Sequence, residues 1–338
     1  MKKIAVIILN WNGSKLLNMF LPSVVKYSPA DLANIYVADN GSTDDSISLL
    51  QEKFPFVNII TLDKNYGFAE GYNLAIKQVD AEYIVLLNSD VEVTQGWLDA
   101  PLEILERDKA IACVQPKILS WKNQAFFEYA GAAGGFIDRY GYPFCRGRIF
   151  DVVEENLGQY DTEIDTMWAS GACLFIRTDV YCKEGGLDAR FFAHQEEVDL
   201  CWRLRCRGYR VVYTPRSVVY HIGGATLQVG HPRKTFLNFR NSLLMIYKNT
   251  DQKDLRKVLN FRFWLDYIAA AKFLFSGHWK DARAVYKARR EFHKLKRVYL
   301  PARKENLAKT VPNPIPELMQ KSIIIAFYLK GKKKYFEL

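Results

Sequence analysis

The chain has 338 residues, of which 49% are hydrophobic and 14% aromatic, and its formal net charge is +10. This length suits one large domain with an appendage, or two domains, because a domain usually has roughly 100–200 residues. The hydrophobic content excludes a disordered chain. The sequence also argues against a membrane-spanning helix, since the apolar stretch 261–275 contains Arg262, Asp266 and Lys272.

The N-terminus and the cysteines indicate a cytoplasmic protein. Residues 1–13 begin like a secretory signal, but the apolar run is short and no small-residue cleavage site follows, so a strand is the better interpretation. The six cysteines include no C-x-x-C pair and no zinc-site spacing. We expect them to be reduced thiols.

The charge is divided unevenly along the chain. Residues 1–230 have 22 Lys+Arg against 29 Asp+Glu, whereas residues 231–338 have 25 against 8. This pattern predicts an acidic body followed by a basic extension.

Apolar runs and helical patterns alternate over the first 120 residues. The strand-like runs are residues 4–9, 35–39, 57–62, 83–87 and 111–116. Between them, apolar residues recur at spacings of three and four in residues 14–27, 44–54, 67–79 and 95–108. Repeated βαβ units of this kind predict an α/β fold, with a mainly parallel sheet sandwiched by helices and the carboxyl ends of its strands on one rim.

Small polar residues stand where four of these strands end. They are Asn10, residues 39–42, residues 65–67, and Asn88, Ser89 and Asp90. Such residues are also common turn formers and helix caps. Together on one rim they predict a nucleotide pocket, in which Asp39 can accept from a base N–H. The first turn, NWNGSK, lacks a phosphate-binding glycine loop, so a divalent cation held by Asp90 would have to neutralise a bound diphosphate.

These motifs carry a family resemblance. VIILNWNG, VADNGSTDDS, NYGFAEGYN and LLNSDVEV, in this order, resemble the inverting family 2 glycosyltransferases with the GT-A fold, and residues 169–221 resemble the second half of their catalytic domain, in the rhamnosyltransferase and galactofuranosyltransferase branch. The resemblance covers roughly residues 3–225. It implies a catalytic domain over residues 1–230, with a nucleotide-binding half (1–120) and an acceptor half (121–230).

The resemblance also implies roles for residues of the donor site. Asp90 matches the metal-binding acid that holds Mn²⁺ or Mg²⁺ against the donor diphosphate, whereas Asn88 replaces the first acid of the family's D-x-D motif. Asp39 matches the base-reading acid. Two further stretches are expected to line the nucleotide-sugar site, at Asn10 and at Asn65, Gly67 and Asn73. Asn73 could equally satisfy a neighbouring loop from within its helix.

Further residues match the catalytic and acceptor side. Glu197 corresponds to the catalytic base and Glu196 to its neighbour, and these two roles could be exchanged; alternatively, both are solvated acids at a helix start. His221 corresponds to a metal ligand, although a histidine ending an apolar strand is often structural. Trp168 falls where an aromatic ring faces the acceptor sugar, or it belongs to the core.

The basic extension, residues 231–338, reads as helices with Lys and Arg on one face and Phe, Trp, Tyr and Leu on the other. They span residues 236–248, 255–275 and 279–300, and an apolar patch beside lysines follows at 322–338. This composition favours the surface of an anionic membrane over nucleic acid, for which no binding motif is present.

The sequence therefore predicts a metal-dependent inverting glycosyltransferase at the cytoplasmic face of a membrane. The expected donor is dTDP-rhamnose or a UDP-sugar, and the expected acceptor is a polysaccharide or a polyprenyl-linked saccharide. A homodimer stays open. The alternative is a non-catalytic nucleotide- or sugar-binding subunit that anchors a glycan-synthesis complex. Asn88 and Glu197, where this sequence departs from the family's motifs, favour this alternative. A sugar-phosphate nucleotidyltransferase would need a different first loop.

Overall fold

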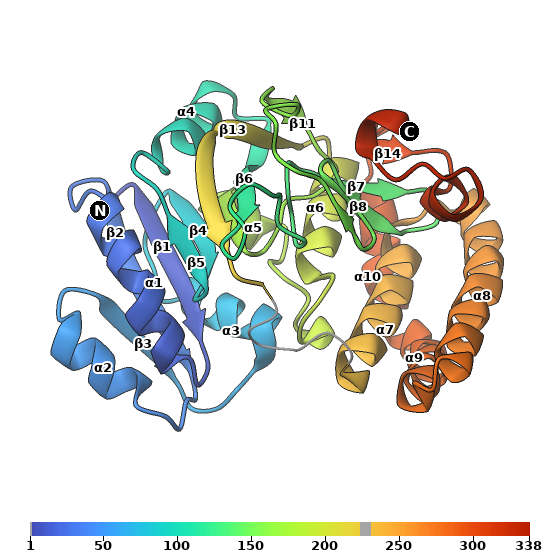
Figure 1. Cartoon of the computed structure of the whole chain (residues 1–338), viewed down its shortest axis with the longest axis horizontal. Coiled ribbons are helices and arrows are strands. Elements are labelled where there is room, and N and C mark those ends of the chain that lie inside the picture. The colour runs from blue at the N-terminus through green and yellow to red at the C-terminus, as the bar shows by residue number, and fades with distance from the viewer. Residues whose placement is uncertain (1, 224–230) are drawn as a thin grey trace.

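The structure is a computed structural model that describes residues 2–223 and 231–338. A twisted central sheet has helices on both faces, and helices from the last third of the chain stand beside it (Figure 1). Within the described residues the main sheet has the order β11-β13-β6-β12-β4-β1-β2-β3, and β5 pairs with β13. Its strands are β1 Ile4–Asn10, β2 Ala33–Asn40, β3 Asn58–Leu62, β4 Tyr83–Asn88, β5 Val91–Val93, β6 Ile111–Ser120, β11 Ile164–Asp165, β12 Cys173–Arg177 and β13 Arg210–His221.

The predicted parallel sheet is confirmed for the first four strands. β1 pairs in parallel with both β2 and β4, and β2 pairs in parallel with β3. The strand predicted at 111–116 is longer, reaching Ser120, and it does not neighbour β4. Instead, β12 inserts antiparallel between β4 and β6, while β6 pairs in parallel with β13.

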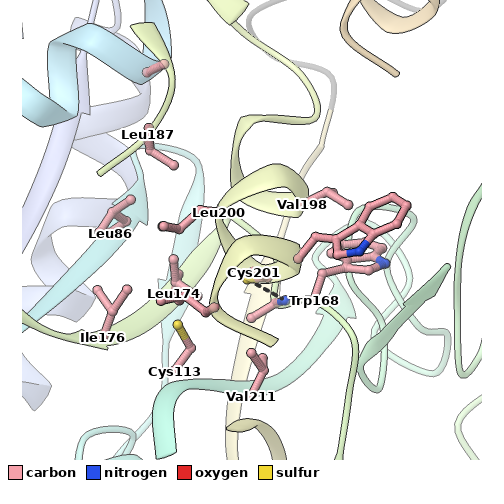
Figure 2. Packing of buried hydrophobic residues seen from close by; sticks show 14 of the residues in the cluster. Leu86, Cys113, Trp168, Leu174, Ile176, Leu187, Val198, Leu200, Cys201 and Val211 are labelled. Carbon is pink, nitrogen blue, oxygen red and sulfur yellow. Dashed lines mark hydrogen bonds between the residues drawn. The ribbon is translucent and has the colours of Figure 1, made fainter. Parts of the chain in front are cut away.

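Alternate residues of the central strands point into two separate hydrophobic cores, one on each face of the sheet. Both faces are buried, so these strands appear in the sequence as continuous apolar runs. Val85 and Leu87 of β4 pack on one face, and Ile84 and Leu86 on the other. Three helices supply buried residues to the first core: α1 Ser14–Tyr27, α2 Ser46–Lys53 and α4 Asp99–Arg107. The second core contains α3 Gly67–Ile76, α5 Thr178–Lys183, the short turn η1 Ala189–Phe191 and α6 Glu196–Cys206. Figure 2 shows part of this second core around α6.

A smaller sheet joins the middle of the chain to its end. Its order is β10-β9-β8-β7-β14, and β14 from the C-terminal region pairs in parallel with β7. The strands are β7 Gly135–Asp138, β8 Pro143–Cys145, β9 Arg148–Ile149, β10 Val152–Val153 and β14 Leu318–Met319. The C-terminal region is therefore joined to the strands of residues 135–153.

The predicted helices of the basic extension are present. They are α7 Pro232–Asn249, α8 Gln252–Phe275, α9 Trp279–Val298 and α10 Leu300–Ala308, followed by the turns η2 Ile325–Leu329 and η3 Tyr335–Glu337. The apolar face of α7 does not face solvent: residues 243–247 are buried in the same core as α6. The predicted domain boundary at residue 230 lies outside the described residues.

Two further expectations are met. All six cysteines are free thiols, and all but Cys182 are buried. Among the residues that the structure describes, no helix combines the length and the hydropathy needed to cross a bilayer.

Candidate active site

The end of β4 and the end of β13 bring Asp90 and His221 together. β5 pairs antiparallel with β13 so that Val91 lies opposite His221, and Asp90 immediately precedes Val91. The backbone N–H of Ile222 donates to the carbonyl oxygen of Asp90, 3.2 Å away. In this register Nε2 of His221 lies 3.1 Å from Oδ1 of Asp90, and both side chains are buried. The register thus places the two predicted metal ligands side by side.

A third buried acid, Glu128, lies behind this pair. Its Oε2 is 3.2 Å from Nδ1 of His221, so the imidazole stands between two carboxylates. Sequence reasoning missed Glu128 because it follows no strand end and belongs to no recognised motif. The backbone places it there: Glu128 N–H donates to the carbonyl of Ile118, 3.1 Å away, which holds its loop along β6.

The two carboxylates control the protonation of His221. Burial disfavours the charged imidazole, but Glu128 and Asp90 outweigh burial and raise the pKa of His221 to about 10. For Asp90, burial acts toward a higher pKa, yet the attraction and hydrogen bond of His221 leave its pKa below the usual value. Without a bound cation, His221 is therefore protonated at neutral pH, and its positive charge lies between the two carboxylates.

The geometry of Asp90 and His221 fits a divalent cation. Neighbouring ligand atoms of an octahedral ion at roughly 2.1 Å lie about 3 Å apart, which matches the 3.1 Å between Oδ1 and Nε2. A carboxylate with an imidazole also suits Mn²⁺ chemically. Across residues 2–223 and 231–338, no group of three or more His, Cys, Asp or Glu side chains is arranged to hold a metal. Other ligands would have to come from the donor and from water.

Asn88 lies at the same place. Its Nδ2 is 3.4 Å from Nε2 of His221, and its backbone N–H donates to the carbonyl of Ala172, 3.0 Å away. Asn88 therefore contributes a polar amide beside the two predicted ligands, and β4 is joined here to the segment that precedes β12.

Asn10 and Asp39 form a hydrogen-bonded pair at the ends of β1 and β2. Nδ2 of Asn10 donates to Oδ1 of Asp39 at 3.0 Å, and the backbone N–H of Ser42 donates to Oδ2 at 3.0 Å. Oδ1 of Asn10 is buried without a hydrogen-bond partner in the described structure. A Cβ on Gly13 would come within 2.4 Å of that oxygen, so any larger residue there would displace the Asn10 side chain.

The third strand end is held by amide side chains. Oδ1 of Asn65 accepts from the backbone N–H of Gly67 at 2.8 Å, and Asn40, one of the polar residues at the end of β2, donates to the carbonyl of Gly67 at 3.0 Å. Gly67 has φ +80°, and a Cβ there would lie 2.5 Å from the ring of Phe192. This close approach joins the start of α3 to the loop that precedes α6.

Asn73 and Trp168 have contacts that favour the packing roles considered for them. The Asn73 amide accepts from the Tyr181 hydroxyl at 2.7 Å and donates to the carbonyl of Leu187 at 2.8 Å, so it joins α3 to the segment after α5. Trp168 is buried, and its indole N–H donates to the carbonyl of Phe136 at 2.9 Å. Figure 2 shows it in the buried cluster around α6.

Glu196 and Glu197 begin α6 after a strained loop. Phe192, His194 and Gln195 all have positive φ, a conformation that is costly for residues with side chains and is concentrated at functional sites. One carboxylate oxygen of each glutamate is buried without a hydrogen-bond partner in the described structure. Burial raises the pKa of Glu196, to which the neighbouring Glu197 adds, and burial also raises the pKa of Glu197. Both acids are therefore poised to hold a proton at higher pH than an exposed glutamate.

The start of α6 lies near the end of β4. A Cβ on Gly171 would be 3.8 Å from the Cβ of Glu197. The next residue, Ala172, accepts the backbone hydrogen bond of Asn88. Two predicted parts of the site, the acid pair and the end of β4, are thus brought together through residues 171–172.

The basic extension supports the loop that precedes Glu196 and Glu197. The sequence did not indicate this contact. Nδ2 of Asn241, on α7, lies within hydrogen-bond distance of the carbonyls of Phe191, Ala193 and His194, at 3.0, 2.9 and 2.8 Å. Lys248 of α7 is 2.7 Å from the buried carboxylate of Asp199 on α6. α7 is therefore part of the structure that positions Glu196 and Glu197.

Comparison with known proteins identifies the domain. Residues 5–152 match the model of Glycosyl transferase family 2. An N-acetylglucosaminyl-diphospho-decaprenol L-rhamnosyltransferase of Mycobacterium tuberculosis is 26% identical over 202 residues, which are 56% of this chain and 66% of that relative. Rhamnosyltransferase WbbL of Escherichia coli is 23% identical over 205 residues, 58% of this chain and 74% of WbbL. The match spans 14% of the O-antigen biosynthesis protein RfbC of Myxococcus xanthus, at 27% identity and 55% of this chain.

Solved structures agree on the fold. GalNAc-T7 with UDP, GalNAc and Mn²⁺ superposes with a TM-score of 0.59 at 15% identity, covering 93% of this chain and 59% of that one. The mannosyltransferase PcManGT of Pyrobaculum calidifontis, in complex with GDP-Man and Mn²⁺, has a TM-score of 0.53 at 14% identity, with coverages of 91% and 84%. TarS 1-349 of S. aureus with UDP-GlcNAc has a TM-score of 0.54 at 15% identity, with coverages of 91% and 89%. Residues 5–152 therefore belong to a family 2 glycosyltransferase domain, and the described structure has the GT-A fold.

Proposed function

We propose that the protein is a metal-dependent, inverting glycosyltransferase that uses a nucleotide-diphospho-sugar. The observation that carries this proposal is the placement of Asp90 and His221, with ligand atoms 3.1 Å apart, near an acid pair whose oxygens lack partners in the described structure. A cation site and a base near one strand end are the two parts that such a transfer requires.

The donor would lie across the ends of β1, β2 and β4. Asp39, held by Asn10 and Ser42, would receive the base, and Asn65 with Gly67 would form the adjoining wall. Mn²⁺ or Mg²⁺ held by Asp90 and His221 would neutralise the diphosphate and make it a better leaving group. The rhamnosyltransferase relatives favour dTDP-rhamnose as the sugar donor, with a UDP-sugar as the other candidate.

Glu197 would act as the base. In an inverting transfer the acceptor hydroxyl attacks the anomeric carbon from the face opposite the diphosphate, and a carboxylate takes the proton as the bond forms. The raised pKa of Glu197 suits this role, because a stronger base accepts the proton more readily. Glu196 is more deeply buried, and burial together with the neighbouring Glu197 raises its pKa.

The acceptor would be a saccharide on a polyprenyl lipid or a growing polysaccharide. The mycobacterial relative is named for a decaprenol-linked acceptor, which favours the lipid-linked form. We propose that the protein works on the cytoplasmic surface of a membrane, and an exposed apolar face of the basic extension supports this proposal.

This face, the α8 face, consists of Phe263, Trp264, Tyr267, Ile268, Leu274 and Phe275. They recur at spacings of four and seven on α8, the outermost helix in Figure 1, and Trp264, Ile268 and Phe275 are 68%, 63% and 93% exposed. A groove of about 470 Å³ beside it, between α8 and α9, is lined by aromatic rings and by Arg289, Arg290, His293 and Lys294. Aromatic and aliphatic side chains rimmed by bases suit an anionic bilayer.

The alternative is a subunit that binds the nucleotide or the sugar without catalysis. Asn88 in place of the first metal-binding acid favours it, since one charge is missing from the site. The acid pair favours catalysis, because a binding subunit has no need for two adjacent carboxylates that each have a buried oxygen without a hydrogen-bond partner in the described structure, an arrangement that costs stability.

A transfer assay decides between the two. The protein is incubated with Mn²⁺, a synthetic polyprenyl-diphosphate saccharide and either dTDP-rhamnose or a UDP-hexose, and the anomeric configuration of the product is read by NMR. We expect an inverted product, and we expect Glu197→Gln to lower kcat by about 10²–10⁴-fold, while the exposed control Glu52→Gln keeps full activity. No transfer with any of these donors would favour the binding subunit.

A further inference from the structure

Glu128 is a buried acid that no motif of the domain accounts for, and it touches the proposed metal site. It is 5% exposed, and its Oε2 lies 3.2 Å from Nδ1 of His221. The other ring nitrogen of His221, Nε2, faces Asp90. Glu128 therefore contacts the metal ligand on the side away from the metal position.

The surroundings hold Glu128 in this place. The backbone N–H of Ala130 donates to its Oε2 at 2.5 Å. Gly223, with φ +71°, lies so close that a Cβ there would be 2.6 Å from Oε1. The carboxylate is thus held by the Ala130 hydrogen bond and closely approached by Gly223, and moving it away from the imidazole would break that hydrogen bond.

An imidazole that binds a cation through one nitrogen carries its proton on the other. That proton needs an acceptor, and the acceptor sets both the tautomer and the ring orientation. A buried carboxylate is the strongest acceptor available to a neutral side-chain N–H. Nδ1 of His221 is buried without a hydrogen-bond partner in the described structure, and Glu128, 3.2 Å away, is the carboxylate beside it, while Nε2 lies beside Asp90.

We propose that Glu128 is a positioning residue, which accepts the Nδ1 proton of His221 and so directs Nε2 toward the divalent cation. This inference rests on the proposed metal-dependent function. In this proposal Glu128, which lies outside the recognised motifs, raises the metal affinity of the site. It thereby makes up part of the affinity that an acid in place of Asn88 would supply.

The test is a titration of the full-length protein with Mn²⁺ alone, followed by the electron paramagnetic resonance signal of free Mn²⁺. The variants are Glu128→Gln, which keeps the volume, and Glu128→Ala. Glu154→Gln is the matched control, because the Glu154 side chain is equally buried but accepts from the hydroxyl of Tyr160 instead of facing His221. Thermal melting without metal shows whether each variant is folded.

We expect the Mn²⁺ affinity to fall about 10–100-fold in both Glu128 variants, the usual effect of losing such an outer partner, and to stay unchanged in Glu154→Gln. Folded Glu128 variants that bind Mn²⁺ within twofold of the wild type would overturn the inference. If the wild type itself binds no Mn²⁺, the proposed metal dependence fails instead, so the two failures are distinguishable.

Discussion

The two glutamates at the start of α6 differ in their surroundings, although they are neighbours in sequence. Glu196 is buried, whereas Glu197 is partly exposed, and each has one oxygen without a hydrogen-bond partner in the described structure. Buried carboxylates without partners cost free energy when ionised. The same burial therefore lowers the stability of the folded protein and raises the pKa of the two glutamates. Both effects can be measured.

The pH dependence of activity reports the raised pKa. A base must be ionised to work, so activity falls as the pH drops through the pKa of the acid pair. Because burial raises the pKa of Glu197, we expect the acidic limb of kcat/KM to lie above pH 4.5, the ordinary value for glutamate. A kcat/KM profile between pH 4 and pH 9 gives the limb directly. A limb at or below pH 4.5 would mean that neither glutamate is the base.

The stability of Glu196→Gln shows how much free energy of unfolding the buried, ionised Glu196 costs. Below pH 4.5 Glu196 is protonated in both states, so its charge costs nothing there. As the pH rises, the unfolded chain loses this proton first, and the folded protein loses stability until the pH passes the raised pKa of Glu196. We therefore expect Glu196→Gln to increase Tm at pH 8 by several degrees, since each kcal/mol shifts Tm by roughly 2–4 °C, and to have little effect at pH 4. Calorimetry at the two pH values checks this, and an equal change at both would contradict it.

Several residues of the site were predictable from the sequence because strand ends gather on one rim. Asn10, Asp39 and Asp90 follow apolar strands, and their proximity follows from the parallel order of β1, β2 and β4. Glu128 was not predictable in this way. Glu128 reaches His221 through a loop that follows β6, and no periodicity marks such a loop.

At the level of the elements, α7 and α6 form one unit. Asn241 lies within hydrogen-bond distance of three carbonyls of the loop that precedes α6, and Lys248 and Asn249 contact the buried Asp199 of α6. The sequence predicted α7 as a helix correctly, but its charge pattern suggested a surface helix of the extension. Which face of a helix becomes buried depends on the element that packs against it. The amino-acid pattern of α7 alone does not predict that this element is α6.

The role of α7 can be tested with Asn241→Ala. Loss of this amide leaves buried carbonyls of the loop unsatisfied, which costs roughly 1–3 kcal/mol, and it loosens the residues before Glu196. We expect a lower free energy of unfolding in urea and a larger loss in kcat than in donor affinity. Asn238→Ala is the matched control, since the hydrogen bond that its amide makes in the described structure goes to the carbonyl of Lys234, one turn earlier on α7 itself. Equal effects of the two substitutions would contradict a positioning role for α7.

The order of the sheet was only partly predictable. The first four strands lie where the alternation of strands and helices placed them, because each is joined to the next by one helix. β12 inserts antiparallel between β4 and β6 after more than fifty residues of loops and short strands. Long-range pairings of this kind leave no local signal in the chain.

For the whole molecule, the α8 face predicts binding to anionic vesicles. We expect the protein to float with vesicles that contain phosphatidylglycerol, to bind less well as salt increases, and to bind weakly to neutral vesicles. The variant Trp264→Ser, Ile268→Ser, Phe275→Ser should lose most of this binding. The control Met19→Ser, Phe56→Ser, Leu157→Ser changes three other exposed apolar side chains, none of them on α8, and should keep it.

The same variants distinguish a second explanation of the α8 face. If it contacts another copy of this chain, the wild type will be a dimer by light scattering and the α8 variant a monomer, with no difference in flotation. That result would contradict the membrane proposal and settle the open question of a homodimer.

The central claim is a nucleotide site that depends on a cation held by Asp90. Calorimetric titration of UDP and dTDP, each with and without Mn²⁺, tests it on the wild type and on Asp90→Asn, which keeps the size of the side chain. We predict that one nucleotide binds at least tenfold more tightly with Mn²⁺ and that Asp90→Asn, shown to be folded by its melting curve, loses this gain. Equal binding with and without Mn²⁺, or an undiminished Mn²⁺ effect in Asp90→Asn, would contradict the claim.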